Sequence, residues 1–546
     1  MLRIKVLIHR TNPANFALSM QSFKNLQPSP EIDVEVKGWH GGLRLMLETQ
    51  DGRELKHTIE NGTYLDMLTT SDIYNEQRRE EKLDYIILLR DNVCLMEKNF
   101  WAIFLDLIEK YPNLAALSVF GQTNDELIGS YYYRQEGEIA KSTYGNPGLV
   151  DAEYLHGDFL ILKADLPMRK SLKEDMVGAY AALAAKLHRQ KAAVIQMAKP
   201  LVLFLEEPSF EYFCFNYQIQ REKELVAKLL NSKEVLLTIG VPTYNRARFL
   251  EKCLANIYDQ VRDLACVEVL VSNDASTDET EAVVKLYLDK ANFSYYRNEK
   301  NMRFGNTLAV FDKAQGKFMV VTGDDDYYND GIILTILETI VRNEDIAIIG
   351  IDHITGGGLK LERHRGLDEY MFTYQLTFTT VNILNRKYYL EVDASKKDYT
   401  NNYPHVNPQL EMIKKHGDFI FLRGARALRE DSGEYKLVGN DSDRQVFKKE
   451  KQVPYGRVFV KEHFELFEPF VNDGISQEAF SKQKYFWWKT MAVPYLSRAK
   501  AYASRNEQDR YEYYIDDDIE ELCKSLFETE KFYPEVQEFL ARLLDK

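Results

Sequence analysis

Three consecutive carboxylates, Asp324, Asp325 and Asp326, follow the apolar run 318–322 and a single glycine. Carboxylates this close repel one another, and each loses hydration when it approaches a buried strand. A divalent cation relieves that cost, because Mg²⁺ and Mn²⁺ bind a few carboxylates and leave room for water and phosphate oxygens. The alternative is a solvated acidic turn after a strand, and the surrounding elements decide between the two.

Those elements alternate between strands and helices from about residue 233 to 450. The run 235–241 is almost continuously apolar, as expected of a strand buried on both faces. Further strands are predicted at 267–271, 293–296 and 317–322, with helices between them. This order predicts an α/β fold with an open, mostly parallel, Rossmann-type sheet.

The ends of the predicted strands carry polar side chains. Ligands bind at the carboxyl ends of the strands in such sheets. Asn245, Asp274 and Asp324 each lie just past such an end, so we expect them to line one crevice. Asp274 is suited to accept a hydrogen bond from a pyrimidine N–H, whereas Asp278 is suited equally to capping the next helix.

The first 220 residues repeat this plan. Residues 9–16 can be laid on 242–249 with a shift of 233, and the same gapless shift carries Asp91 to Asp324. Asn92 and Val93 then stand where the second copy has its other two carboxylates. We interpret the chain as a tandem duplication in which the first copy keeps one acidic residue of three.

The predicted organisation has four parts: a degenerate α/β domain at 1–220, a linker helix at 221–232, an intact α/β domain at 233–454 and a helical region at 455–546. The C-terminal helices are expected at 464–470, 477–503, 517–529 and 534–544. The aromatic run 485–488 either packs a helix onto its own domain or forms an interfacial membrane patch.

Composition narrows the partners and the compartment. A net charge of -14 argues against nucleic acid, which needs a basic surface. The five cysteines show no close pairs, which favours a reducing compartment. The N-terminus is too short and too charged for a signal peptide, and no apolar run reaches the roughly 20 residues of a membrane span. We expect a soluble, cytoplasmic protein, with peripheral contact at the inner face of the membrane as an open alternative.

The second half resembles a GT-A-fold, family-2 glycosyltransferase, most closely the abequosyltransferase-like branch, which builds bacterial surface polysaccharides. The resemblance covers about 233–440, and residues 1–200 only as a degenerate GT-A-like copy. Its motifs are Ile239-Gly240-Val241-Pro242-Thr243-Tyr244-Asn245-Arg246, Val271-Ser272-Asn273-Asp274-Ala275-Ser276-Thr277-Asp278, Tyr296-Arg297-Asn298-Glu299-Lys300-Asn301 and Gly323-Asp324-Asp325-Asp326.

This resemblance implies an inverting, metal-dependent transfer from a nucleotide-diphosphate sugar, with a UDP-sugar expected first. The acceptor is expected to be a hydroxyl of a glycan, a lipid-linked glycan or a glycoprotein. Mn²⁺ or Mg²⁺ is expected at Asp324 and Asp326. The residues expected to contact the donor are Pro242, Tyr244, Asn245, Asp274, Arg303, Asn306, Asp324 and Asp325.

The catalytic base departs from the family pattern. The acidic pair that usually opens a late helix is replaced by the stretch 399–414, where His405 falls nearest and Glu411 follows. A histidine titrates near neutral pH and is a competent base, although a helix-entry histidine without chemical function is the alternative. Asp352 and Asp393 are weaker rivals. The first copy keeps Glu174-Asp175 at the matching helix, and lids are predicted at 429–433 and 356–358.

Two other classes of protein compete with this interpretation. A nucleotidyltransferase also uses acidic residues on an α/β sheet, but it needs a basic, glycine-rich phosphate loop that 242–246 does not supply. A catalytically weak sugar-binding or scaffolding subunit fits the first copy better than the intact triplet of the second. A homo-oligomer stays open, and the sequence does not identify the donor sugar, the acceptor or the linkage.

Overall fold

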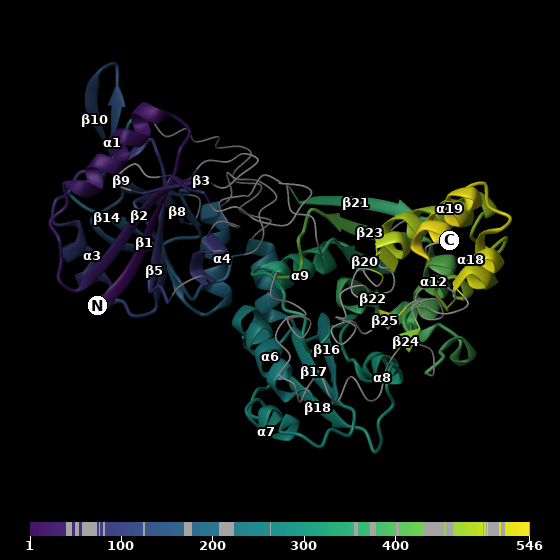
Figure 1. Ribbon diagram of the computed structural model, residues 1–546. Helices are drawn as coiled ribbons and strands as arrows, with labels where there is room; N and C mark the ends of the chain where they lie inside the picture. Colours follow the sequence, from purple (N-terminus) through teal and green to yellow (C-terminus); the bar gives the residue numbers. More distant parts are fainter. Residues whose placement is uncertain are drawn as a thin grey trace.

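A computed structural model shows three regions along the chain: an α/β region at the N-terminus, a second α/β region in the middle and helices at the C-terminus (Figure 1). The structure describes residues 1–39, 46–49, 54–56, 74–75, 77–79, 82–123, 126–168, 177–206, 223–262, 264–353, 359–371, 378–399, 403–429, 453–454, 462–494, 496–497, 500, 513–514 and 519–544.

The first region is built on a sheet whose described strands run in the order β11-β14-β7-β13-β5-β1-β2-β3-β4. These strands are β1 (Leu2–His9), β2 (Ile32–Trp39), β3 (Met46–Thr49), β4 (Glu54–Lys56), β5 (Tyr85–Arg90), β7 (Leu114–Ser118), β11 (Gly148–Asp151), β13 (Phe159–Lys163) and β14 (Lys191–Gln196). The helices that accompany them are α1 (Pro13–Lys24), α3 (Phe100–Lys110) and α4 (Val177–Leu187).

A second, smaller sheet of the first region has the order β12-β8-β9-β15-β6, with β10 paired to β9 as a hairpin. Its strands are β6 (Val93–Leu95), β8 (Phe120–Thr123), β9 (Glu126–Gln135), β10 (Glu138–Tyr144), β12 (Tyr154–Leu155) and β15 (Val202–Phe204). The hairpin stands out from the body of the region (Figure 1). Residues 223–231, between the two α/β regions, are helical.

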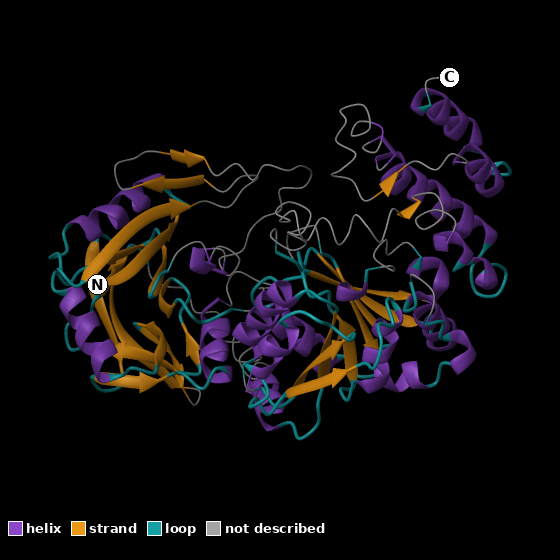
Figure 2. Ribbon diagram, turned by 60° about the horizontal axis from the view of Figure 1, so that its bottom comes forward, coloured by secondary structure: helices purple, strands orange, loops and turns teal. Residues whose placement is uncertain are grey.

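The second region has one sheet in the order β18-β17-β16-β19-β22-β20-β23-β21. Its strands are β16 (Leu237–Thr243), β17 (Val267–Asn273), β18 (Phe293–Arg297), β19 (Phe318–Val321), β20 (Ile348–Ile351), β21 (Lys360–Arg365), β22 (Asn382–Asn385) and β23 (Asp418–Arg423). Its helices are α6 (Ala247–Val261), α7 (Thr280–Lys285), α8 (Gly305–Lys313), α9 (Ile332–Arg342), α10 (Gly366–Tyr370), α11 (Arg386–Leu390) and α12 (Val406–His416), with the short η2 (Thr379–Val381) and η3 (Ala394–Lys396). Figure 2 shows helices on both sides of these strands.

The two sheets share one topology. The path β2-β1-β5-β13-β7-β14-β11 and the path β17-β16-β19-β22-β20-β23-β21 have the same order of parallel and antiparallel neighbours. The register repeats too, because Ile4 pairs with Tyr85 and Leu237 pairs with Phe318, which are the same positions shifted by 233. The predicted fold class, two tandem α/β domains followed by helices, is therefore confirmed.

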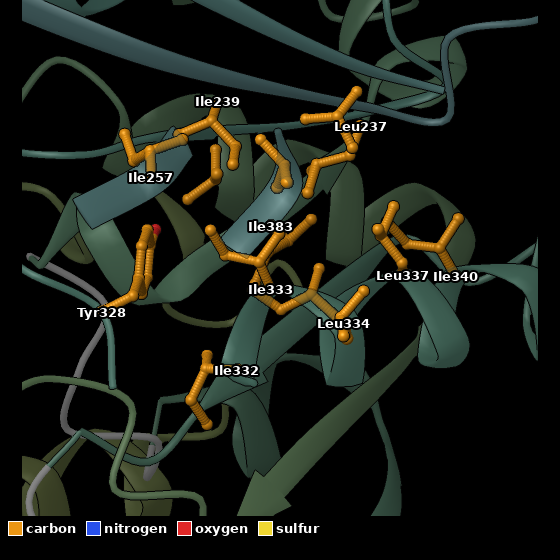
Figure 3. Close-up of a cluster of buried hydrophobic side chains, with 14 of the residues drawn as sticks. Leu237, Ile239, Ile257, Tyr328, Ile332, Ile333, Leu334, Leu337, Ile340 and Ile383 are labelled. Carbon is orange, nitrogen blue, oxygen red and sulfur yellow. The ribbon is translucent and has the colours of Figure 1, made fainter. Parts of the chain in front are cut away.

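The hydrophobic core of the second region lies on both faces of its sheet. On one face, side chains of β16 such as Leu237 and Ile239 pack against Ile257 of α6 and Ile333 and Leu337 of α9 (Figure 3). The sequence favours this arrangement, because α6 repeats apolar residues at the spacing of one helix face while β16 is apolar on both faces.

The C-terminal helices complete the core on the other face of the sheet. They are α15 (Glu462–Glu465), η5 (Glu468–Phe470), α16 (Gln477–Trp487), η6 (Trp488–Ala492), α18 (Ile519–Phe527) and α19 (Tyr533–Leu543). Trp488 is 1% exposed, and its ring centroid lies 5.6 Å from that of Phe527 and 5.5 Å from that of Phe539. The aromatic run therefore packs within its own domain at Trp488. Among the described helices, none has the length and apolar character needed to cross a bilayer.

Candidate active site

The candidate site lies at the carboxyl edge of the second sheet, where β17, β16 and β19 end side by side. These strands run parallel with β16 in the middle, so the residues that follow them meet at one edge. Thr243 closes β16, Asp274 follows β17, and the acidic triplet begins at Asp324 after β19. The structure thus brings Asn245, Asp274 and Asp324 to the same edge.

An arginine bridges the first two carboxylates of the triplet. Arg246 Nε lies 3.0 Å from Asp324 Oδ1, and Arg246 Nη2 lies 3.0 Å from Asp325 Oδ2. Thr243 Oγ1 donates a hydrogen bond to Asp324 Oδ2 at 2.7 Å. Burial nevertheless raises the pKa of Asp324 to about 6, with Arg246 opposing the rise and Asp325 adding to it. The arginine compensates only part of the negative charge at this edge.

The third carboxylate has a neutral partner. Thr380 Oγ1 donates to Asp326 Oδ2 at 2.5 Å and accepts a hydrogen bond from the Gly323 N–H at 3.2 Å. Burial, followed by repulsion from Asp325, raises the pKa of Asp326 to about 7. The environment thus disfavours the charged form of Asp326, and a nearby cation would favour it.

The counterpart of Asp324 in the first domain serves a different purpose. Asp91 accepts hydrogen bonds from Thr11 N at 2.5 Å, Thr11 Oγ1 at 2.8 Å and Asn12 N at 2.5 Å. Its carboxylate is thus occupied by the turn between β1 and α1. Val93, at the position of Asp326, is a fully buried strand residue. The first copy keeps the carboxylate as a support for the backbone.

Asp274 organises the loop before α8. It is 2% exposed, and its oxygens accept hydrogen bonds from the Arg303 N–H and from Asn298 Nδ2, both at 2.9 Å. Arg303 has a left-handed φ of 55°, which the carboxylate helps to hold. Asn306 is buried and accepts from Asn298 Nδ2 at 2.9 Å and Ser272 Oγ at 2.6 Å. Contact of these residues with a nucleotide stays a prediction.

The turn after β16 is tied to the turn after β17. Asn245 has a φ of 53°, and its Oδ1 accepts from the Thr277 N–H at 2.7 Å. Asp278 Oδ2 accepts from the Ala247 N–H at 2.9 Å, and its Oδ1 accepts from the Thr280 N–H at 3.1 Å. Asp278 therefore supports the first turns of α6 and α7, which is the capping alternative that the sequence offered.

An aromatic side chain that follows β16 is exposed to solvent at this edge. Tyr244 is 40% exposed, whereas Pro242 is half-buried within β16 and pairs with Ser272. An exposed aromatic face beside a polar crevice is suited to stacking on a planar ring.

The two residues predicted as the catalytic base do not share a face of α12. His405 is 3% exposed and immediately precedes the helix. Because α12 leads through Gly417 directly into β23, which runs parallel to β20, His405 lies towards the carboxyl edge of the sheet. Glu411 is six residues on, about 240° around the helix, and its carboxylate lies 3.4 Å from Lys396 Nζ.

The two weaker candidates for the catalytic base, Asp393 and Asp352, accept hydrogen bonds from backbone N–H groups. Asp393 is exposed and caps η3 by accepting from the Ser395 N–H at 2.8 Å. Asp352 follows β20, is 1% exposed and accepts from the Gly424 N–H at 3.4 Å. Several predicted features lie outside the described residues: Glu174, Asp175, 356–358 and 430–433.

Sequence reasoning missed the parts played by Arg246 and Thr380. Arg246 is the last residue of the motif that contains Tyr244 and Asn245, so a sequence signal for it is present. Thr380 lies 54 residues after Asp326 and carries no local motif.

The residues present fit a hard divalent cation that shares its ligands with a substrate. Within the described ranges, no group of three or more His, Cys, Asp or Glu side chains is arranged to enclose a metal ion. Mg²⁺ and Mn²⁺ bound to nucleotides commonly use one or two carboxylates and complete their shells with phosphate oxygens and water. Asp324 and Asp326 supply such a pair, and burial raises the pKa of both carboxyl groups, an effect that a bound cation would oppose.

Comparison with known proteins identifies the class. Residues 238–397 match the model of the family Glycosyl transferase family 2. A Campylobacter jejuni GalNAc(5)-diNAcBac-PP-undecaprenol beta-1,3-glucosyltransferase is 26% identical over 54% of this chain and 82% of its own length. The abequosyltransferase of Salmonella typhimurium is 35% identical over 17% of this chain and 28% of its own length.

The structural likeness is weaker than these sequence matches. A Pyrobaculum calidifontis mannosyltransferase, solved with GDP-Man and Mn²⁺, is 14% identical and covers 61% of this chain and 93% of its own, at a TM-score of 0.34. Residues 238–397 therefore form a domain of the glycosyltransferase family 2, and the named relatives are glycosyltransferases. The protein thus carries a family-2 glycosyltransferase domain and, N-terminal to it, a second α/β domain with the same strand topology.

Proposed function

We propose that the second domain transfers a sugar from a nucleotide-diphosphate sugar to a hydroxyl of a glycan, with inversion at the anomeric carbon and with a divalent cation. The observation that carries this proposal is the edge formed by Asp324, Asp325 and Asp326. It lies at the carboxyl ends of parallel strands, within the family-2 domain, and its negative charge is incompletely compensated.

Asp324 and Asp326 would hold Mn²⁺ or Mg²⁺. When bound, the cation supplies a positive charge that stabilises the departing nucleoside diphosphate. The protein's own groups would do the rest. Arg246 compensates part of the charge of Asp324 and Asp325 while the phosphates are absent. Tyr244 would stack on the nucleobase, and the loop fixed by Asp274 would border the nucleotide.

His405 is proposed as the base. In the transfer, the bond between the anomeric carbon and the phosphate oxygen breaks, and the acceptor oxygen forms the new bond from the opposite face. The acceptor's proton passes to the imidazole, which must be neutral to receive it. The position of His405 ahead of α12, towards the carboxyl edge, supports this role. Glu411 is the second candidate.

The donor and acceptor are proposed from the resemblance and from the relatives. We propose a UDP-sugar donor and a glycan, lipid-linked glycan or glycoprotein acceptor. One relative's printed name specifies a glycan linked to undecaprenol through a diphosphate, and an acceptor with such a lipid would be held at a membrane surface. A cytoplasmic protein with peripheral membrane contact is therefore proposed.

Release of nucleoside diphosphate tests the reaction. The purified full chain is incubated with a panel of nucleotide sugars in Mn²⁺, in Mg²⁺ and in a chelator. Release should require the cation and should be lost in Asp326→Ala, while Asp91→Ala, the matched change in the first copy, retains it per folded molecule. Equal loss in both variants would refute the assignment of catalysis to the second domain. No release from any donor, together with retained sugar binding, would instead support the scaffolding alternative.

The base is tested separately. His405→Ala should abolish transfer and leave donor binding near the wild-type value, and Glu411→Ala should retain turnover. Undiminished turnover in His405→Ala would remove this residue from the mechanism.

A further inference from the structure

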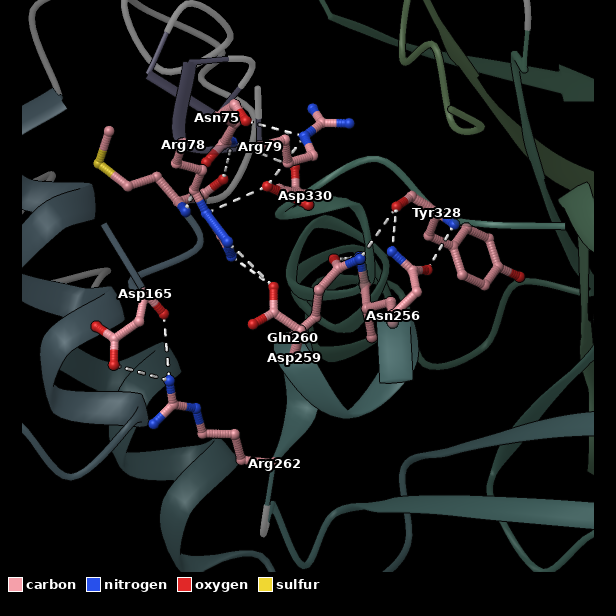
Figure 4. A network of polar contacts seen from close by, with 12 residues as sticks. Asn75, Arg78, Arg79, Asp165, Asn256, Asp259, Gln260, Arg262, Tyr328 and Asp330 are labelled. Atoms are coloured by element: carbon pink, nitrogen blue, oxygen red, sulfur yellow. Dashed lines mark hydrogen bonds and ion pairs between the residues drawn. The ribbon is translucent and has the colours of Figure 1, made fainter. Parts of the chain in front are cut away.

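The segment that follows the acidic triplet is held by side chains of the first domain. Arg79 Nη1 donates to Asn329 Oδ1 at 2.9 Å, and Arg79 Nε lies 3.3 Å from Asp330 Oδ2. Arg78 Nε lies 3.2 Å from the same oxygen, and Asn75 Nδ2 donates to the Asp330 carbonyl at 3.3 Å. Figure 4 shows these side chains converging on Asp330 from the other domain. The contact joins residues 250 positions apart in the chain.

Asp330 depends on this contact for its countercharge. Its side chain is 2% exposed, and a buried carboxylate without a cationic partner is strongly unfavourable. In the described part of the chain, the ion pairs of Asp330 are made with Arg78 and Arg79, both from the first domain. Arg78 is itself anchored to the second domain by Asp259 Oδ2, 2.5 Å from its Nη2.

A short chain of hydrogen bonds leads from this segment to the third carboxylate. The Tyr328 backbone exchanges two hydrogen bonds with the Asn256 side chain, at 2.8 and 2.9 Å. The Tyr328 hydroxyl donates to the Thr380 carbonyl at 2.9 Å and lies 2.8 Å from Thr322 Oγ1. Thr380 in turn donates to Asp326 at 2.5 Å. The first domain is thus connected to Asp326 through Asn329, Tyr328 and Thr380.

We infer that Arg78 and Arg79 are positioning residues of the active site: the degenerate domain holds the 328–330 segment in place and thereby sets the affinity of the acidic triplet for cation and nucleotide. This inference rests on the proposed function, because it assigns the triplet a cation. Ligand sites are sensitive to shifts well below 1 Å in the groups that support them. A displacement of Asp330 reaches Thr380 through the neighbouring Asn329 and the hydroxyl of Tyr328.

A merely structural role for the interface would give a different result. If Arg78 and Arg79 only join the domains, their removal lowers the unfolding temperature and leaves the affinity of each folded molecule unchanged. The interface contains a matched control for this case. Arg262 donates from Nη2 to the Asp165 carbonyl at 3.2 Å, across the same domain boundary, at the end of α6 and away from the 328–330 segment (Figure 4).

The experiment measures the Mn²⁺ concentration that half-saturates UDP binding to the full chain, by calorimetry, alongside thermal unfolding. Arg79→Ala should raise that concentration by about 3-fold to 30-fold, the range expected for a positioning change of this kind. Arg262→Ala should leave it within about 2-fold of wild type. Asp330→Asn placed in the Arg79→Ala chain should reduce the increase, because it removes the buried negative charge that has then lost one of its two arginine partners.

The outcomes separate this inference from the proposed function. A wild-type half-saturation in Arg79→Ala, whatever its unfolding temperature, would overturn the inference and leave the proposed function intact. Failure of wild-type protein to bind UDP in a Mn²⁺-dependent way would overturn the proposed cation site and the inference with it. If Arg79→Ala does not fold, Arg79→Lys decides. It keeps the charge, but its single nitrogen replaces the separate Nη1 and Nε that contact Asn329 and Asp330. A half-saturation equal to wild type would refute the inference.

Discussion

Neutralising Asp326 should stabilise the metal-free protein while abolishing its activity. Its pKa rises from 3.8 to about 7 on folding, so the folded state holds a proton that the unfolded state has released between those values. Stability therefore falls as the pH rises through this window. A rise of roughly 3 units corresponds to about 4 kcal/mol at about 1.4 kcal/mol per unit. Because Asp326 is only half-buried, we expect about 1–3 kcal/mol in practice.

Asp326→Asn removes the charge and keeps an oxygen to accept the Thr380 hydrogen bond. In chelator at about pH 8, its unfolding temperature should exceed that of wild type by about 2–4 °C for each kcal/mol in a domain of about 200 residues. The gain should shrink as the pH falls towards about 4, where the folded and unfolded states of the wild type become equally protonated.

Asp91→Asn is the matched control, and it should have the opposite sign. Asp91 accepts two backbone N–H groups and the Thr11 hydroxyl, so neutralising it weakens three hydrogen bonds and should destabilise the protein by about 1–3 kcal/mol. If Asp326→Asn is no more stable than wild type at pH 8, or if its effect does not depend on pH, the cost of burying the triplet has been misjudged.

Three further changes have defined outcomes. Mn²⁺-dependent UDP binding should weaken as the pH falls from about 8 to about 5.5, because Asp326 and Asp324, with pKa values of about 7 and about 6, take up protons that the cation must displace; a titration at several pH values measures this. Gly240→Ala should destabilise the second domain by about 1–3 kcal/mol in denaturant unfolding, since its Cβ would lie 2.0 Å from Val310 Cγ1. Trp488→Ala should cost about 3–5 kcal/mol in the same assay, because the side chain is buried in the core that the C-terminal helices share with the second domain.

The sequence predicted the positions of strands and helices, which depend on local patterns of apolar residues. The match of residues 9–16 to 242–249 and of Asp91 to Asp324 predicts a shift of 233 between the two copies, and the strand register shows the same shift. The antiparallel insertion of β22 between β19 and β20 was not predicted, since alternating patterns do not encode strand direction. At the site, the position of Asp274 was predicted but its hydrogen-bond partners were not. These include the backbone N–H of Arg303, and the identity of a residue does not indicate where its backbone N–H points.

The contact between the two domains at Arg79 and Asn329 could not be predicted from the sequence. The pair of Arg79 with Asn329 joins residues 250 positions apart, and neither belongs to a motif. This contact gives a physical reason for the persistence of a copy that has lost two carboxylates of three. Asp330 would be a buried, unpaired charge without Arg78 and Arg79, so the second domain cannot be separated from the first without exposing or neutralising that carboxylate. On the two proposals made above, one copy of the fold performs the chemistry and the other supports the same site.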